Sequence, residues 1–160
     1  VSKSGPFEIP FRHMVTAVQI ARGDQEGLFQ ALQRSGYDIT ARRDEIIGRA
    51  RNVQTWLDKY APDYVKFQVQ ESLPPAVKNL SESERRGLGL LAERVDDKSA
   101  AEIHDLVYAV AAEEKLDSKK FFQAIYLAFL GDRQGPKVGW FVSSLERDFV
   151  CQRLGEAARA

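Results

Sequence analysis

The side chains best suited to chemistry gather in one stretch, residues 119–141. A polar loop, Asp132-Arg133-Gln134, lies there between two glycines, and Lys137 and Trp140 follow it closely. Cations, a side-chain amide and an aromatic ring can hold a ligand by charge, hydrogen bonds and stacking. This chemistry is recognition rather than bond making, and loops fixed on a rigid base are common places for recognition.

Groups that carry out catalysis show no comparable gathering. His13 and His104 each lack a second histidine or cysteine at the spacing of metal ligands. The carboxylates fall at capping and surface positions, and no P-loop, dinucleotide fingerprint or nucleophile elbow occurs. The single cysteine, Cys151, cannot form an internal disulfide and is interpreted as a small buried residue. We therefore expect no catalytic residue, no metal site and no cofactor in this chain.

A helix must position the polar loop. Apolar residues recur there at steps of three and four, which predicts a helix with one buried face: Phe121, Phe122, Ile125, Tyr126, Phe129 and Leu130. Gly131 suits the left-handed conformation that ends a helix, and Gly135-Pro136 suits the start of the next one. We expect Tyr126 and Trp140 to be the aromatic residues that stay partly exposed.

The rest of the chain also has helical patterns, so the predicted fold class is all-α. Helix starts are expected near Phe11, after Asp24 and after Thr40, and at two capping boxes, Ser81 with Glu84 and Ser99 with Glu102. Residues 63–73 alternate partially, but a lone strand would have no partner, so we predict an irregular connection with a helical turn. Two packed helical subdomains are predicted, 1–73 and 74–160, with a hinge at Leu73-Pro74-Pro75.

Composition limits the function further. The 160 residues carry 23 basic and 23 acidic side chains, so a polyanion could be attracted only locally. No apolar run approaches the roughly 20 residues of a membrane helix, and the N-terminus has no signal-peptide core, so we expect a cytoplasmic protein without a membrane partner. A monomer is favoured. The opening without methionine suggests a fragment of a longer protein.

A second basic group lies on the helix predicted after Thr40. Arg42, Arg43 and Arg49 lean toward one face and form a basic patch that could contact a polyanion. The alternative is an ordinary solvated face with ion pairs four residues apart, such as Glu45 with Arg49. The sequence leaves both interpretations open.

The residues around the loop resemble a known family. The runs 121–126, Leu130-Gly131, Gly135-Pro136 with Gly139 and Phe141, and Phe149-Val150 with Arg153-Leu154 resemble the C-terminal end of class I lysyl-tRNA synthetases. Residues 9–13, 60–63 and 103–108 resemble the helical region before that end. The resemblance implies a helical anticodon-binding region of a lysine–tRNA ligase. The catalytic domain, with its ATP and lysine sites, would lie before residue 1.

The terminal part also resembles the anticodon domain of class I glutamyl-tRNA synthetases. Gly131, Gly135-Pro136 and Val138 fall on the Gly, Thr-Pro and Leu of that family's loop. Gln123 and Tyr126 fall on its Gln and Arg that face the anticodon. Tyr for Arg and Gly for Thr are departures from that family's pattern, so the hydrogen bonds of the Arg and Thr side chains do not carry over to positions 126 and 135.

The resemblance implies tRNA(Lys) as the partner, with no DNA partner. Splayed anticodon bases would stack on aromatic or Arg planes and hydrogen-bond along their edges. The implied RNA-binding residues are Gln123, Tyr126, Arg133, Gln134, Gly135, Pro136, Lys137, Val138 and Trp140. If the basic patch binds RNA, Arg42, Arg43 and Arg49 would contact the tRNA stem. The alternatives are a helical protein-interaction or scaffold module and a free-standing regulator derived from a synthetase.

Overall fold

The computed structural model describes residues 9–160, and helices make up this part of the chain. Eight α-helices occur in it: α1 (Phe11–Ala21), α2 (Gln25–Arg34), α3 (Arg43–Lys59), α4 (Glu82–Arg94), α5 (Ala100–Glu113), α6 (Ser118–Leu130), α7 (Val138–Ser144) and α8 (Arg147–Arg159). Two 3-10 turns, η1 (Asp63–Val65) and η2 (Pro75–Asn79), lie between α3 and α4. Residues 9–160 contain no strand. The predicted all-α class is confirmed.

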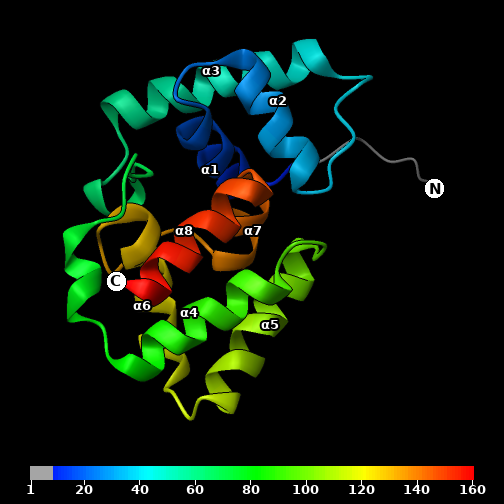
Figure 1. The fold of residues 1–160 in the computed structure, drawn as a ribbon. Helices are drawn as coiled ribbons and strands as arrows, with labels where there is room; N and C mark the ends of the chain where they lie inside the picture. Colours follow the sequence, from blue (N-terminus) through cyan, green and yellow to red (C-terminus); the bar gives the residue numbers. More distant parts are fainter. Residues whose placement is uncertain (1–8) are drawn as a thin grey trace.

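The helices pack around two hydrophobic clusters. Helices α1, α2 and α3 enclose the first, which includes Met14, Leu32 and Ile46. Helices α4 to α8 enclose the second, which includes Phe121 and Phe141. The two groups lie one above the other in Figure 1. The boundary between residues 73 and 74 stays a prediction, and residues 1–8 of the predicted first subdomain lie outside the described part.

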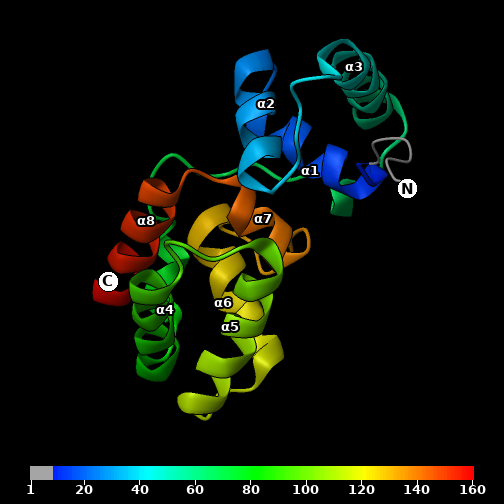
Figure 2. The same cartoon turned by 90° about the vertical axis from the view of Figure 1, so that its right-hand side faces the viewer.

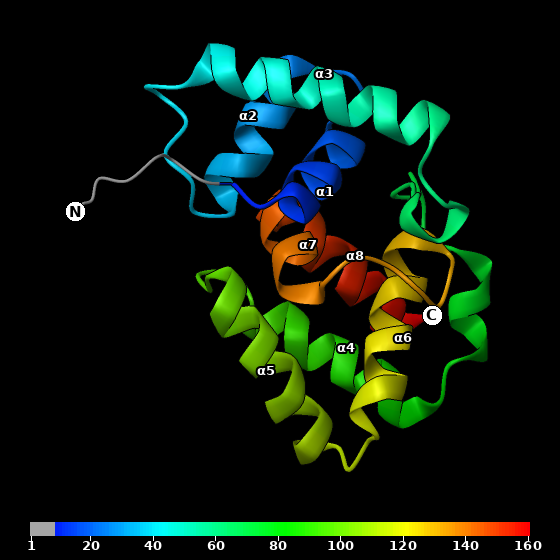
Figure 3. The same cartoon turned by 180° about the vertical axis from the view of Figure 1, so that it is seen from behind.

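Helix α7 joins the two groups of helices. It lies between the N-terminal helices and α5 in Figures 1 and 3, and the side view in Figure 2 agrees. The Nε of Arg34 in α2 donates to the carbonyl oxygen of Ser144 at 2.9 Å. The hydroxyl oxygens of Ser35 and Ser144 lie 2.6 Å apart. A polar seam therefore fastens α7 to the N-terminal helices.

The connection between α3 and α4 is irregular, as predicted, but it is held at several points. The Nε2 of Gln19 donates to the Val65 carbonyl at 3.2 Å, and its Oε1 accepts from the Phe67 amide at 2.9 Å. The backbone N–H of Gln70 donates to the backbone carbonyl of Phe129 in α6 at 2.8 Å. The segment therefore ties α1 to the C-terminal end of α6.

Most predicted helix starts are confirmed, with one exception. Both capping boxes form, and the carboxylates of Asp24 and Asp117 cap α2 and α6. The predicted cap at Thr40 is wrong, because α3 begins at Arg43. The amide and hydroxyl of Thr40 instead donate to Oδ1 of Asp38, at 3.1 and 2.7 Å. A local turn centred on the aspartate has taken the side chain that could have capped the helix.

Within residues 9–160, no helix combines the length and apolar character that crossing a bilayer requires.

Candidate functional site

The loop after α6 begins where the sequence places it. Gly131 ends the helix with a φ of 72°, and its amide donates to the Leu127 carbonyl at 3.0 Å. Arg133, Gln134 and Lys137 are exposed beyond it. Within residues 9–160, neither Arg133 nor Lys137 forms an ion pair. The loop thus presents two cations and an amide to solvent.

Tyr126 fastens this loop to α6. Its hydroxyl donates to the Pro136 carbonyl at 2.6 Å, and burial raises the pKa of Tyr126 to about 12. Its ring also fills the space beside Gly135: a Cβ added there would lie 2.7 Å from Cδ1 of Tyr126 and 2.9 Å from Cδ1 of Leu130. Gly135 is therefore required by close packing. The departure from Arg to Tyr at position 126 gives the loop an internal anchor.

The remaining predicted residues lie at different depths. Gln123 is half-buried in α6, about one turn before Tyr126, and Pro136 is half-buried in the loop. Val138 is only 2% exposed, so its side chain belongs to the hydrophobic core. Arg133, Gln134 and Lys137 are therefore the side chains that the loop offers most freely to a partner.

Trp140 is half-buried at the junction between the two groups of helices. Its ring centroid lies 3.8 Å from that of His13 and 5.5 Å from that of Tyr37, with a 15° angle to the Tyr37 ring. The Tyr37 hydroxyl lies 2.6 Å from Nδ1 of His13. Sequence reasoning missed these two partners because nothing local links residues so distant in the chain. Trp140 consequently helps to hold the two groups of helices together, while part of its ring stays exposed.

The ring of His13 is neutral in the folded protein. Burial, with smaller contributions from the charges of Arg12 and Lys137, lowers the pKa of His13 from 6.5 to about 4. Only 8% of the residue is exposed. Its Nε2 atom has no hydrogen-bond partner within residues 9–160. The ring thus carries a neutral polar atom that the described part of the protein leaves unsatisfied.

This lowered pKa predicts a pH-dependent stability. The unfolded chain binds the His13 proton below about pH 6.5 and the folded chain only near pH 4, so stability is complete above pH 6.5 and falls toward pH 4. Between pH 7.5 and pH 5 the loss is expected to be about 2 kcal/mol. Urea unfolding of the wild type and of His13→Gln at both pH values checks this. Equal losses in the two proteins would show that another group is responsible.

The predicted arginines of α3 are engaged in the fold. Nη1 of Arg42 lies 3.4 Å from Oε2 of Glu45. Glu45 therefore pairs with Arg42, three residues before it, and not with Arg49 as the sequence suggested. Arg43 lies 3.5 Å from Glu26 and stacks over Phe29 at 4.1 Å. Nη2 of Arg49 donates to the Ile9 carbonyl at 2.6 Å. Contacts of these arginines with an RNA stem stay a prediction.

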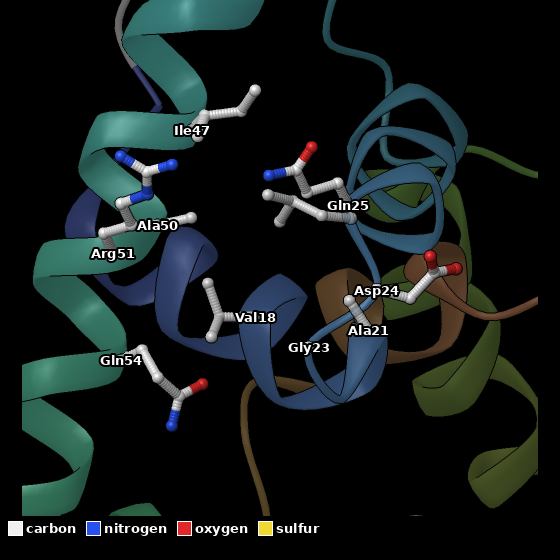
Figure 4. Close-up of a pocket in the computed structure, with 10 residues that line it drawn as sticks. Val18, Ala21, Gly23, Asp24, Gln25, Ile47, Ala50, Arg51 and Gln54 are labelled. Atoms are coloured by element: carbon white, nitrogen blue, oxygen red, sulfur yellow. The ribbon is translucent and has the colours of Figure 1, made fainter.

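A separate hollow lies between α1, α2 and α3 (Figure 4). Its volume is about 190 Å³, and Val18, Ala21, Ile47 and Ala50 give it a mainly apolar lining. Arg51 and Gln54 lie along its α3 side in the same view. None of the side chains predicted for recognition lines it.

The described residues show no arrangement for metal chemistry. No group of three or more His, Cys, Asp or Glu side chains within residues 9–160 could hold a metal ion. Cys151 is half-buried, and burial raises the pKa of its thiol, which keeps it protonated at neutral pH. The candidate site is a polar, cationic loop beside an aromatic junction.

An all-α scaffold that presents such a loop defines a class of binding module. The chain belongs to the anticodon binding domain family, whose model matches residues 51–158.

Relatives of known name agree with the predicted resemblance, which is confirmed. Lysine–tRNA ligase 1 of Methanosarcina acetivorans is 39% identical over 94% of this chain and 32% of its own length. The lysine–tRNA ligase of Archaeoglobus fulgidus is 41% identical over 94% of this chain and 30% of its own length. The lysine–tRNA ligase of Thermococcus kodakarensis is 34% identical over 92% of this chain and 29% of its own length. The chain spans about a third of the length of these relatives.

Proposed function

We propose that this chain is the anticodon-binding part of a lysine–tRNA ligase and binds tRNA(Lys) through residues 131–137. The observation that carries the proposal is the loop itself: Arg133, Gln134 and Lys137 are exposed on a backbone fixed by the Tyr126 to Pro136 hydrogen bond. Ligation of lysine with ATP is proposed for the whole enzyme, with the catalytic residues outside this chain. A cytoplasmic location is part of the same proposal.

The loop chemistry suits an unpaired RNA loop. Sequence-specific RNA recognition uses hydrogen bonds to exposed base edges and stacking on flat side chains. Gln134 and Arg133 can reach base edges, and Lys137 can hold a phosphate, which positions the RNA without reading its sequence. The two loop cations act locally, so the zero net charge of the chain does not oppose binding.

The role of Lys137 predicts a change in salt dependence. Lys137→Gln should weaken tRNA binding evenly across anticodon sequences and lower the slope of log affinity against log salt by about one. Lys115→Gln is the matched control, because Lys115 is exposed in the turn before α6, at the opposite end of that 13-residue helix. Filter binding at several salt concentrations measures both slopes. Equal slopes in the two variants would remove Lys137 from the interface.

Anticodon dependence tests the proposed function as a whole. Wild-type protein is titrated with a tRNA(Lys) transcript and with the same transcript changed at the central anticodon base. Loss of one good base contact is expected to weaken binding by about 1–3 kcal/mol. Equal affinity for the two transcripts would contradict the proposal.

A protein-binding scaffold is the less favoured function. A groove for a partner helix needs exposed apolar side chains along the recognition loop. The exposed side chains between Gly131 and Val138 are polar or charged instead. The loop therefore favours RNA.

A further inference from the structure

A groove lies on the other side of the loop, where the two groups of helices meet. Its volume is about 320 Å³, at the small end of the range for ligand pockets. Helix α1, the end of α3, η1 and the segment from Gly135 to Trp140 form its walls. The groove thus adjoins the proposed recognition loop but is built largely from the N-terminal helices.

Flat side chains dominate the lining. Phe11, Trp56, Tyr64, Phe67 and Trp140 all border the groove. Phe11 is 51% exposed and Tyr64 is 77% exposed. Phe11 meets Trp56 edge to face, with ring centroids 5.1 Å apart. These rings offer stacking faces that the fold leaves open.

The charge of the lining has one sign. Arg12 and Lys137 border the groove, and both are exposed. Among residues 9–160, no aspartate or glutamate borders it, although the chain carries as many acidic as basic residues. Two cations without carboxylates favour an anionic ligand.

A buried polar atom without a partner belongs to one of the residues that line the groove. His13 borders it, is 8% exposed, and has no partner for Nε2 within residues 9–160. A neutral imidazole nitrogen can donate or accept according to its tautomer. A ligand with a polar edge could supply the missing hydrogen bond once it displaces the neighbouring side chains that cover Nε2.

We infer that this groove holds one unstacked nucleobase of a single-stranded RNA loop, with the adjoining phosphates on Arg12 and Lys137. The inference rests on the proposed function and extends it to the N-terminal helices. Phe11, Arg12 and His13 lie before residue 51, where the match to the family begins. A base with its phosphate satisfies the stacking faces, the positive charge and the polar atom together, whereas an apolar peptide would leave the charges unused.

Two tyrosines of similar exposure provide a matched test. Tyr64 is 77% exposed and borders the groove, and Tyr60 is 74% exposed and does not. The probe is an RNA hairpin with the anticodon stem and loop of tRNA(Lys), together with versions that carry one abasic loop position each. Tyr64→Ala should weaken binding about 5- to 100-fold, and Tyr60→Ala by less than twofold.

The two tryptophans report occupancy directly. The chain has only Trp56 and Trp140, and both border the groove, so a stacked base should quench the intrinsic fluorescence.

The abasic hairpins identify the base that enters the groove. At one abasic position the wild type and Tyr64→Ala should bind equally, because the stacking partner is absent from both complexes.

The possible results separate the two proposals. If wild-type protein does not bind the intact hairpin, the proposed function fails. If it binds, but Tyr64→Ala and Tyr60→Ala match the wild type, the groove is not a base site and the proposed function stands. If Tyr64→Ala lowers the affinity by the same factor for every abasic hairpin, the inference is also overturned.

Discussion

Arg153→Ala is expected to lower the free energy of unfolding by about 3 kcal/mol, because it strips one buried and one part-buried carbonyl of their donors. Arg153 is 2% exposed. Its Nη1 donates to the Ala128 carbonyl at 3.1 Å and its Nη2 to the Gln70 carbonyl at 2.8 Å. Ala128 is among the last four residues of α6, whose carbonyls have no donor within the helix. One guanidinium therefore closes the end of α6 and fixes the connection from α3.

Arg159→Ala is the control, because Arg159 lies on the same helix and is exposed. It should change stability by less than about 0.5 kcal/mol. Thermal unfolding measures the difference, and Arg153→Ala should lower Tm by roughly 10 °C in a chain of this size. Similar Tm values for the two variants would show that water replaces the lost donors without cost.

The consequence of Arg153 extends to the recognition loop. Gly131 follows the end of α6 that Arg153 closes, and the Gln70 amide donates to the neighbouring Phe129 carbonyl. Losing the guanidinium would loosen the helix end from which the loop departs. We therefore expect Arg153→Ala to weaken RNA binding as well, although the side chain itself is buried.

Local signals explain how much of the fold was predictable. Capping boxes, the Gly131 stop and the apolar stripe of α6 act within a few residues, so the sequence pattern determined them and the structure agrees. The exception at Thr40 is local too, because Asp38 competes for the same hydroxyl. Where one short turn and one helix cap compete for a side chain, the pattern alone does not decide between them.

Partners distant in the chain explain what could not be predicted. The burial of Arg153 could not be read from its residue type, because its carbonyl partners lie 25 and 83 residues away. The loop of the candidate site was predicted from Gly131 to Trp140, whereas the His13 and Tyr37 rings against Trp140 were not. Only the packing of α7 on the N-terminal helices brings these rings together.

Gly139→Ala is expected to destabilise the fold by about 3 kcal/mol, because α7 and α5 approach too closely at this residue to admit a methyl group. A Cβ at Gly139 would overlap the backbone carbonyl oxygen of Ala100, and it would lie 3.4 Å from Cβ of His104. Backbone cannot rotate away as a side-chain tip can. Helix α7 would have to move, and Trp140, the next residue, would move with it.

Gly48→Ala is the opposite case and serves as the control. Gly48 lies inside α3, and apart from its chain neighbours and the backbone of its own helix, no atom of residues 9–160 lies within 4 Å of its Cβ position. Alanine is the better helix former there, so a gain of about 0.5–1 kcal/mol is expected. Urea unfolding gives both values, and the fluorescence of Trp140 in the folded state, measured in a Trp56→Phe background, reports whether its stacking on His13 has changed. A loss below about 1 kcal/mol with unchanged fluorescence would mean that the contact of α7 with α5 yields easily. Gly139 would then not be the residue that sets the position of Trp140 beside the loop.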